Sequence, residues 1–222
     1  LDAVTAGVLT ATVADTAANL ATLTGTGNAY TVTISEGSTA TIAELITINA
    51  ATTGGITLST ATIQANYSNT VANLTSAFAG ISSHTGTMAA TGTAPTVAQA
   101  NVLDAVTAGV LTATVQDDAT ALATLTGTGN AYTITLDDDD EATIAELITI
   151  NAATTGSITL NAKTIADDYS DTVANLTNAF AGITTHTGTL TATGTAPTVA
   201  QANTLDAVTA GVLTATVADT AA

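Results

Sequence analysis

The chain has 222 residues, with 18 acidic side chains, one basic side chain (Lys163) and a formal net charge of −17 at pH 7. This charge repels nucleic acid and anionic membranes, which argues against both as partners, and no apolar run approaches the ~20 residues that a membrane span needs. Hydrophobic residues make up 46% of the chain, enough for a packed core, which excludes the intrinsically disordered class.

A repeated segment organises the chain. The motif LDAVTAGVLTATV occurs at 1–13, 103–115 and 205–217, a spacing of 102 residues both times. Residues 1–102 and 103–204 are identical at 77 positions, and 205–222 matches the start of the chain at all 18 positions. Self-similarity at a fixed period is typical of repeat architectures. We therefore predict repeat 1 at 1–102, repeat 2 at 103–204 and the start of repeat 3 at 205–222, as a window of a longer array.

The first half of the period alternates strand and helix patterns. Residues 8–13, VLTATV, alternate with period two and are rich in β-branched side chains, which predicts a short strand. Asp15 or Thr16 can cap a helix over 17–23, whose apolar residues recur every three positions. Residues 30–34 predict a second strand, with apolar side chains on one face and threonines on the other.

The same alternation continues through the second half of the period. Its apolar residues again switch between a spacing of three or four and a spacing of two. Helices are expected over 42–48 and 71–81, the latter capped by Ser68 or Asn69, and strands over 56–58, with an extension to Ile63 left open, and over 87–91.

A last helix closes the period. Apolar residues lie three apart over 97–106, Pro95 stands just before this segment, and Thr96 is a suitable N-cap. Gly109 follows the helix and is expected to end it with a positive φ.

These elements make four strand–helix units in each period, with brief connections. Such units favour parallel strands joined by crossovers, and unlimited repetition favours a solenoid over a closed domain. The expected fold class is therefore α/β: a solenoid with one parallel sheet, short helices on one face and about four turns per 102-residue repeat. Each turn would stack at ~4.8 Å, so one repeat would advance roughly 19 Å.

The strongest chemical feature is a run of five adjacent carboxylates, which repel one another and which Ca²⁺ would neutralise. The alternative is a solvated acidic turn before a helix, where negative charge is favoured in any case. No other cofactor is expected. The candidate metal residues are Asp137, Asp138, Asp139, Asp140 and Glu141. A sparser second group consists of Asp167, Asp168 and Asp171.

Each full repeat has one histidine, His84 or His186, which has no cysteine or second histidine nearby. We interpret it as a residue at a helix end, beside the negative end of the helix dipole. The abundant serines and threonines stand in no GxSxG or SxxK pattern. We therefore expect no catalytic residues and no enzyme activity.

Threonines recur on the expected outer face of the sheet. TxT pairs on successive strands would form two ranks, which resemble the ice-binding faces of some antifreeze solenoids. The alternative is that threonine is simply a suitable polar residue for an exposed strand. The candidate surface-binding residues are Thr10, Thr12, Thr31, Thr33, Thr112, Thr114, Thr133 and Thr135.

Three motifs together carry a resemblance: VAQANxLDAVTAGVLTATV at 97–115 and 199–217, LATLTGTGNAYTIT at 122–135, and TIAELITI at 143–150. They resemble the long Ala/Thr-rich repeat arrays of giant secreted cell-surface proteins of cyanobacteria and other marine bacteria. The resemblance implies export and a role at the cell surface, in extracellular fibres, adhesion or matrix.

The sequence thus predicts a structural repeat segment of a large extracellular surface or filament protein. Its expected partners are further copies of the same repeat, joined end to end, with no nucleic acid and no membrane insertion. The alternative is a binding module: either a calcium-stabilised adhesin or a solenoid whose threonine face binds ice or another surface.

Overall fold

A computed structural model describes residues 7–137 and 141–218 of the chain. The chain divides into two compact units, the first made of residues 1–94 and 101–113 and the second of residues 95–100 and 114–222. The sequence repeat and this division by packing have different boundaries, so the three repeats remain a sequence prediction.

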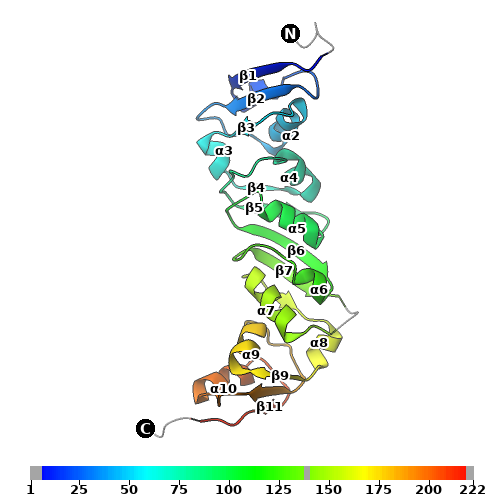
Figure 1. The fold of residues 1–222 in the computed structure, drawn as a ribbon, viewed down its shortest axis with the longest axis vertical. Coiled ribbons are helices and arrows are strands. Elements are labelled where there is room, and N and C mark those ends of the chain that lie inside the picture. Colours follow the sequence, from blue (N-terminus) through cyan, green and yellow to red (C-terminus); the bar gives the residue numbers. More distant parts are fainter. Residues whose placement is uncertain (1–6, 138–140, 219–222) are drawn as a thin grey trace. The chain divides into compact units, whose positions relative to one another are not determined.

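The first unit alternates short strands with short helices, and its strands pair in parallel with their neighbours along the chain (Figure 1). The α/β class with parallel strands and short helices is therefore confirmed. β1 pairs with β2, β2 with β3, β4 with β5, and β5 with the start of β6. The elements are β1 (Thr10–Asp15), α1 (Ala17–Leu20), β2 (Ala29–Ile34), α2 (Ile42–Ala51), β3 (Ile56–Thr57), α3 (Thr60–Gln64), β4 (Tyr67–Thr70), α4 (Val71–Ala77) and β5 (Met88–Thr91).

Two further elements, α5 (Val97–Asp104) and β6 (Leu111–Asp117), contribute to both units. The second unit continues with the same alternation, and β8 and β10 each pair in parallel with a neighbouring strand. Its elements are α6 (Ala119–Leu122), β7 (Ala131–Leu136), α7 (Ile144–Ala153), β8 (Ile158–Thr159), α8 (Ala162–Ala166), β9 (Tyr169–Thr172), α9 (Val173–Ala179), β10 (Leu190–Thr193), α10 (Val199–Asp206) and β11 (Leu213–Thr214).

The third strand of the period differs from its prediction. β3 ends at Thr57, and Ser59 then caps the helix α3 by accepting a hydrogen bond from the amide of Thr62 (3.2 Å). Ile63 therefore lies in a helix. Because α3 separates β3 from β4, β3 pairs only with β2 and β4 pairs only with β5. The described strands consequently form more than one sheet, and the prediction of one continuous sheet is wrong.

The same interruption changes the number of elements. Residues 10–104 contain five strand–helix pairs, whereas the sequence pattern indicated four, and α3 is the additional helix. It also moves the start of the next helix. Ser68 and Asn69 lie in β4, and the N-cap of α4 is Thr70, whose hydroxyl accepts from the amide of Asn73 (3.4 Å).

Other predicted helix starts are confirmed. Thr16 caps α1. At the start of α5, the amide of Thr96 donates to Gln99 Oε1 (3.0 Å), and the amide of Gln99 donates to Thr96 Oγ1 (3.3 Å). These reciprocal bonds form a capping box, which satisfies two amides that the helix itself leaves unpaired.

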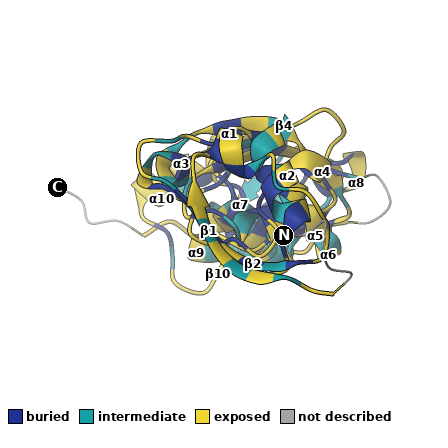
Figure 2. Cartoon of the chain, turned by 90° about the horizontal axis from the view of Figure 1, so that it is seen from above, coloured by how far each residue is buried: buried dark blue, intermediate teal, exposed yellow. Residues whose placement is uncertain are grey.

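Buried residues lie in the interior, and exposed residues cover the outside (Figure 2). In β2 the side chains of Tyr30, Val32 and Ile34 are buried, whereas Thr31 is exposed. Helices α1, α2 and α4 pack against one another in sequence, as do α6, α7, α9 and α10 in the second unit. The apolar face predicted from the period-two pattern is therefore confirmed in β2.

Gly109 does not have the predicted positive φ. A Cβ atom at this position would collide with the carbonyl group of Gly86, and one at Gly54 would collide with that of Tyr30. These glycines are needed because two main-chain segments approach each other closely, and not because of a left-handed turn.

The core packing predicts the effect of truncating Phe180, which is completely buried and contacts the ring of Tyr169 edge to face, with centroids 5.4 Å apart. We expect Phe180→Ala to lower the free energy of unfolding by about 3–5 kcal/mol, because apolar contacts are lost and a cavity forms. Urea denaturation followed by circular dichroism measures this change. Val212→Ala is the control, because Val212 is 64% exposed, and should stay within about 0.5 kcal/mol of the unsubstituted chain. Equal losses in both variants would contradict the packing.

Candidate functional site

The most distinctive side chains are the buried polar residues, which occupy six positions that recur 102 residues later in the chain. Every member is at most 8% exposed. Within the described parts of the chain, no buried side-chain nitrogen or oxygen lacks a hydrogen-bond partner. The buried polar residues are Asn28, Thr52, Ser59, Thr62, His84 and Thr107, and, 102 residues later, Asn130, Thr154, Asn161, Thr164, His186 and Thr209.

Threonines of a Thr-x-Gly triplet link one main-chain segment to the preceding one. Thr107 Oγ1 donates to the carbonyl of Gly86 (2.7 Å) and accepts from the amide of Gly109 (2.9 Å). Thr52 makes the same bonds to Tyr30 (2.6 Å) and Gly54 (2.9 Å). Each hydroxyl therefore satisfies two buried main-chain groups at the point where the glycine allows close approach. The triplet makes this pair of bonds at 52–54, 107–109, 154–156 and 209–211.

The histidines are not at helix ends as predicted: both are completely buried, and each forms an isolated β-bridge, His84 with Thr107 and His186 with Thr209. His84 Nε2 lies 2.8 Å from the carbonyl oxygen of Ala65, and its Nδ1 lies 2.9 Å from Thr107 Oγ1. His186 has the same geometry, at 2.9 Å from the carbonyl of Asp167 and 3.0 Å from Thr209 Oγ1. Each imidazole thus connects three segments that lie about 20 residues apart in the sequence. We call His84 with Ala65 and Thr107, and His186 with Asp167 and Thr209, the histidine nodes.

Aromatic rings enclose each histidine node. The ring centroids of Tyr67 and Phe78 lie 5.4 and 5.0 Å from that of His84, and the Tyr67 hydroxyl donates to the carbonyl of Ala40 (2.7 Å). Burial raises the pKa of Tyr67 to about 12. Burial also lowers the pKa of His84, since the charged imidazolium loses its hydration, while the bond to the Ala65 carbonyl opposes this shift.

The predicted calcium site lies only in part within the described residues. Asp138, Asp139 and Asp140 are outside them. Asp137 follows β7, where its carboxylate accepts a hydrogen bond from Gln116 Nε2 and its amide donates to the carbonyl of Asp117 (3.0 Å). Glu141 is exposed. Among residues 7–137 and 141–218 no three His, Cys, Asp or Glu side chains are grouped so that they could hold a metal ion.

The second acidic group is dispersed over separate contacts. Asp168 Oδ1 accepts from the amide of Thr189 (2.6 Å), and Asp171 Oδ1 accepts from the amide of Thr172 (2.6 Å). Asp167 joins the histidine node through its carbonyl oxygen. These three aspartates therefore serve different turns and do not converge on one point.

The threonine face is exposed, but its ranks differ from the predicted ones. Of the eight predicted surface-binding threonines, Thr33 and Thr135 are half-buried and the other six are exposed. The register places Thr12 beside Thr31, but it places Thr10 beside Ala29. The TxT pair of β1 is therefore displaced by two residues along the strand relative to the TxT pair of β2. The two straight ranks of threonines that the sequence predicted are not formed there.

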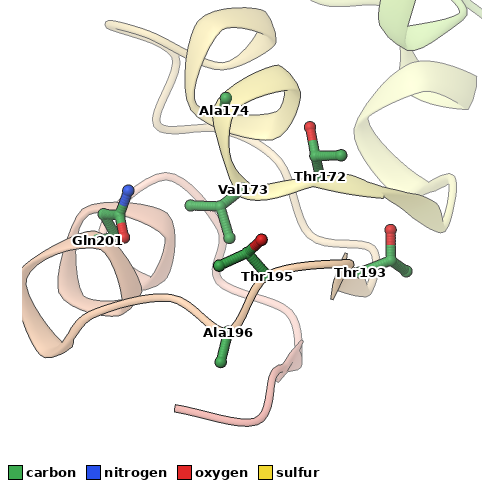
Figure 3. A pocket seen from close by; sticks show the side chains of 7 residues that line it. All are labelled: Thr172, Val173, Ala174, Thr193, Thr195, Ala196 and Gln201. Carbon is green, nitrogen blue, oxygen red and sulfur yellow. The ribbon is translucent and has the colours of Figure 1, made fainter. Parts of the chain in front are cut away.

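An open hollow of about 360 Å³ lies near the starts of α9 and α10 (Figure 3). Two of its polar side chains act as helix caps: Thr172 accepts from the amide of Asn175, and Gln201 accepts from the amide of Thr198. None of the lining residues is titratable. They are Thr172, Val173, Ala174, Thr193, Thr195, Ala196 and Gln201.

Comparison with known proteins gives no match to a family model, a curated protein or a solved structure. No helix within the described residues is both long enough and apolar enough to cross a membrane.

The buried polar positions were missed from the sequence, although the Thr-x-Gly triplet is visible there. Glycines that lie outside positive-φ turns mark close main-chain approach, and a threonine two residues earlier supplies the hydroxyl. The aromatic partners of His84 come from β4 and from the end of α4, and no local pattern indicates that these segments surround one ring.

The threonine hydroxyl of a node predicts a stability effect. Thr107→Val keeps the shape but leaves the amide of Gly109 and Nδ1 of His84 without this partner. We expect the free energy of unfolding to fall by about 1–3 kcal/mol, the cost of leaving a buried polar group unsatisfied. Thr112→Val, on the exposed face of β6, is the matched control and should have little effect. Urea denaturation at pH 7.5 compares the two, and equal behaviour would contradict a role for the hydroxyl.

Proposed function

We propose that the chain is a structural repeat segment of a large extracellular surface or filament protein, and that its turns stack as an α/β solenoid. The observation that carries this proposal is the repeated set of buried polar residues. In a solenoid each turn contacts only its neighbours, so the same interactions recur at fixed intervals along the chain.

The hydrogen bonds of these residues have the sequence separation that stacked turns would give. The Leu9 amide donates to Asn28 Oδ1, 19 residues away. Thr52 reaches Tyr30 over 22 residues, and Thr107 reaches His84 over 23. Each bond therefore joins two segments about 20 residues apart in the sequence, and this supports nearest-neighbour stacking as the source of stability.

The proposed solenoid has four turns per repeat although each repeat has five helices, because we count β3, α3 and β4 as one turn. β3 pairs with β2 on one side of this turn, and β4 pairs with β5 on the other. At ~4.8 Å for each of four turns, one repeat would extend a rod by roughly 19 Å.

Surface composition supports an extracellular location. Lys163 is the single Lys or Arg residue in 222, so a protease of trypsin's specificity has one cleavage point in this segment. The 18 acidic residues give mutual repulsion that keeps such rods dispersed in solution. A durable, acidic spacer or coat is the role that these properties favour, with further copies of the repeat as its partner.

The length of the rod tests the proposal. Tandem chains of two, four and six repeats should appear in cryo-electron micrographs as rods of constant width, whose length rises by about 19 Å per repeat. Averaged power spectra should show a meridional reflection near ~4.8 Å. Compact particles, whose diameter grows only slowly with repeat number, would contradict the stacked arrangement and with it the structural role.

The exposed threonine face favours a second candidate, a module that binds ice or another ordered surface. Thr12 and Thr31 are exposed neighbours on β1 and β2. If this face binds ice, the protein should show thermal hysteresis, and Thr31→Lys should abolish it because the long charged side chain disrupts the flat surface. Thr26→Lys, in the exposed turn before β2, is the control and should keep the activity. Absence of thermal hysteresis in the unsubstituted protein would exclude ice as the ligand.

A further inference from the structure

The hydrogen bonds of each histidine node allow Nδ1 of the imidazole to accept a proton. The carbonyl of Ala65 can only accept, so His84 Nε2 carries a hydrogen atom. In the neutral ring Nδ1 can only accept, and the single hydroxyl hydrogen of Thr107 points either to Nδ1 or to the carbonyl of Gly86. When Nδ1 is protonated it donates to Thr107 Oγ1, and the hydroxyl hydrogen turns to the carbonyl of Gly86, 2.7 Å away. The protonated ring therefore has the complete set of hydrogen bonds, whereas the neutral ring leaves either Nδ1 or the Gly86 carbonyl without the Thr107 hydrogen. The cost that opposes protonation is the burial of a charge.

The surroundings of the two nodes differ in charge. His84 is packed against Tyr67 from β4, Phe78 after α4, Ala65 after α3 and Thr107 after α5, and of these only Tyr67 is titratable. His186 is packed against the corresponding residues Tyr169, Phe180, Asp167 and Thr209, and its charged neighbours are Asp167 and Asp168. Tyr169 stays neutral because burial raises its pKa well above the usual value.

The charge difference comes from two exchanges: Asp167 stands where the first repeat has Ala65, and Asp168 stands where it has Asn66. The second exchange leaves the hydrogen bonds in place. In the first repeat Asn66 Oδ1 accepts from the amide of Thr87 (2.9 Å). In the second repeat Asp168 Oδ1 accepts from the amide of Thr189 (2.6 Å). A carboxylate therefore replaces an amide in the same contact, and it adds a negative charge near the imidazole without altering the node.

We propose that the two repeats respond to acid in order: His186 takes up its proton at a higher pH than His84, and acidification weakens the node of His84 more. This device is separate from the proposed structural role, because it depends only on contacts within each unit.

The sign follows from linkage. Burial lowers the pKa of both histidines below the ordinary value of about 6.5, so the unfolded chain binds the protons first as the pH falls. Stability is therefore full above this value and is lost as the pH decreases towards the pKa of the folded state. The negative charges of Asp167 and Asp168 oppose the lowering of the His186 pKa, so the node of His186 loses less stability on acidification. The first unit, which holds His84, is the more acid-sensitive one.

Titration of the two rings tests this order. Long-range ¹H–¹⁵N NMR spectra of the 222-residue protein, recorded from pH 7.5 to 4.5, report the protonation of each imidazole. We expect the midpoint of His186 at a higher pH than that of His84. Hydrogen exchange should show that amides at 84–86 lose protection before those at 186–188.

Exchanges between the repeats provide matched variants. Asp168→Asn should move the midpoint of His186 to lower pH, and Asn66→Asp should move that of His84 to higher pH. Asp171→Asn is the control, because it also removes one negative charge. Asn69, at the same position of the first repeat, shows that an asparagine keeps the contacts: it accepts from the following amide and from the side chain of the asparagine four residues later, as Asp171 does. The proposal is overturned if the two midpoints coincide, if His84 titrates first, or if Asp171→Asn shifts His186 as much as Asp168→Asn does.

Discussion

The structure depends on the satisfaction of main-chain polar groups that stacking segments remove from water. A buried amide or carbonyl without a partner costs about as much free energy as a lost hydrogen bond. Because the strands are short, pairing between them satisfies only part of the main-chain groups. Side chains from the next segment supply the missing partners. The hydroxyls of Thr52 and Thr107 and the imidazole of His84 each bind main-chain atoms about 20 residues away. A fixed set of six polar positions, which recurs after 102 residues, therefore holds the segments in register.

Close approach of the main chain is the second half of this arrangement. Gly54 and Gly109 bring one segment against the carbonyl of the segment before it, where a Cβ atom would collide. The threonine two residues earlier then reaches the same carbonyl. One member of the set changes between repeats but keeps its hydrogen bonds. Ser59 accepts from the amide of Thr62 and donates to the carbonyl of Ser38. Asn161 likewise accepts from the amide of Thr164 and donates to the carbonyl of Asp137.

Charge varies where the hydrogen bonding allows it. Asn66 becomes Asp168 and Asn69 becomes Asp171, and in each pair the oxygen accepts from the same main-chain amide. The second repeat can therefore carry many more carboxylates than the first on the same framework. The residues that form the framework and the residues that set the surface charge are therefore different ones.

The sequence by itself determined the repeat, the α/β class and the elements whose burial follows a local period. Alternation in Tyr30–Ile34 identifies β2 and its inner face, and Thr16 identifies the start of α1, because these signals lie within a few residues of each other. Only the tertiary structure decided the rest. The helix that ends β3, the close contact at Gly109, the pairing of Thr10 with Ala29 and the burial of His84 all depend on a segment about 20 residues away. The stable conformation at each of these positions depends on contacts with that distant segment. A pattern of neighbouring residues contains no information about those contacts.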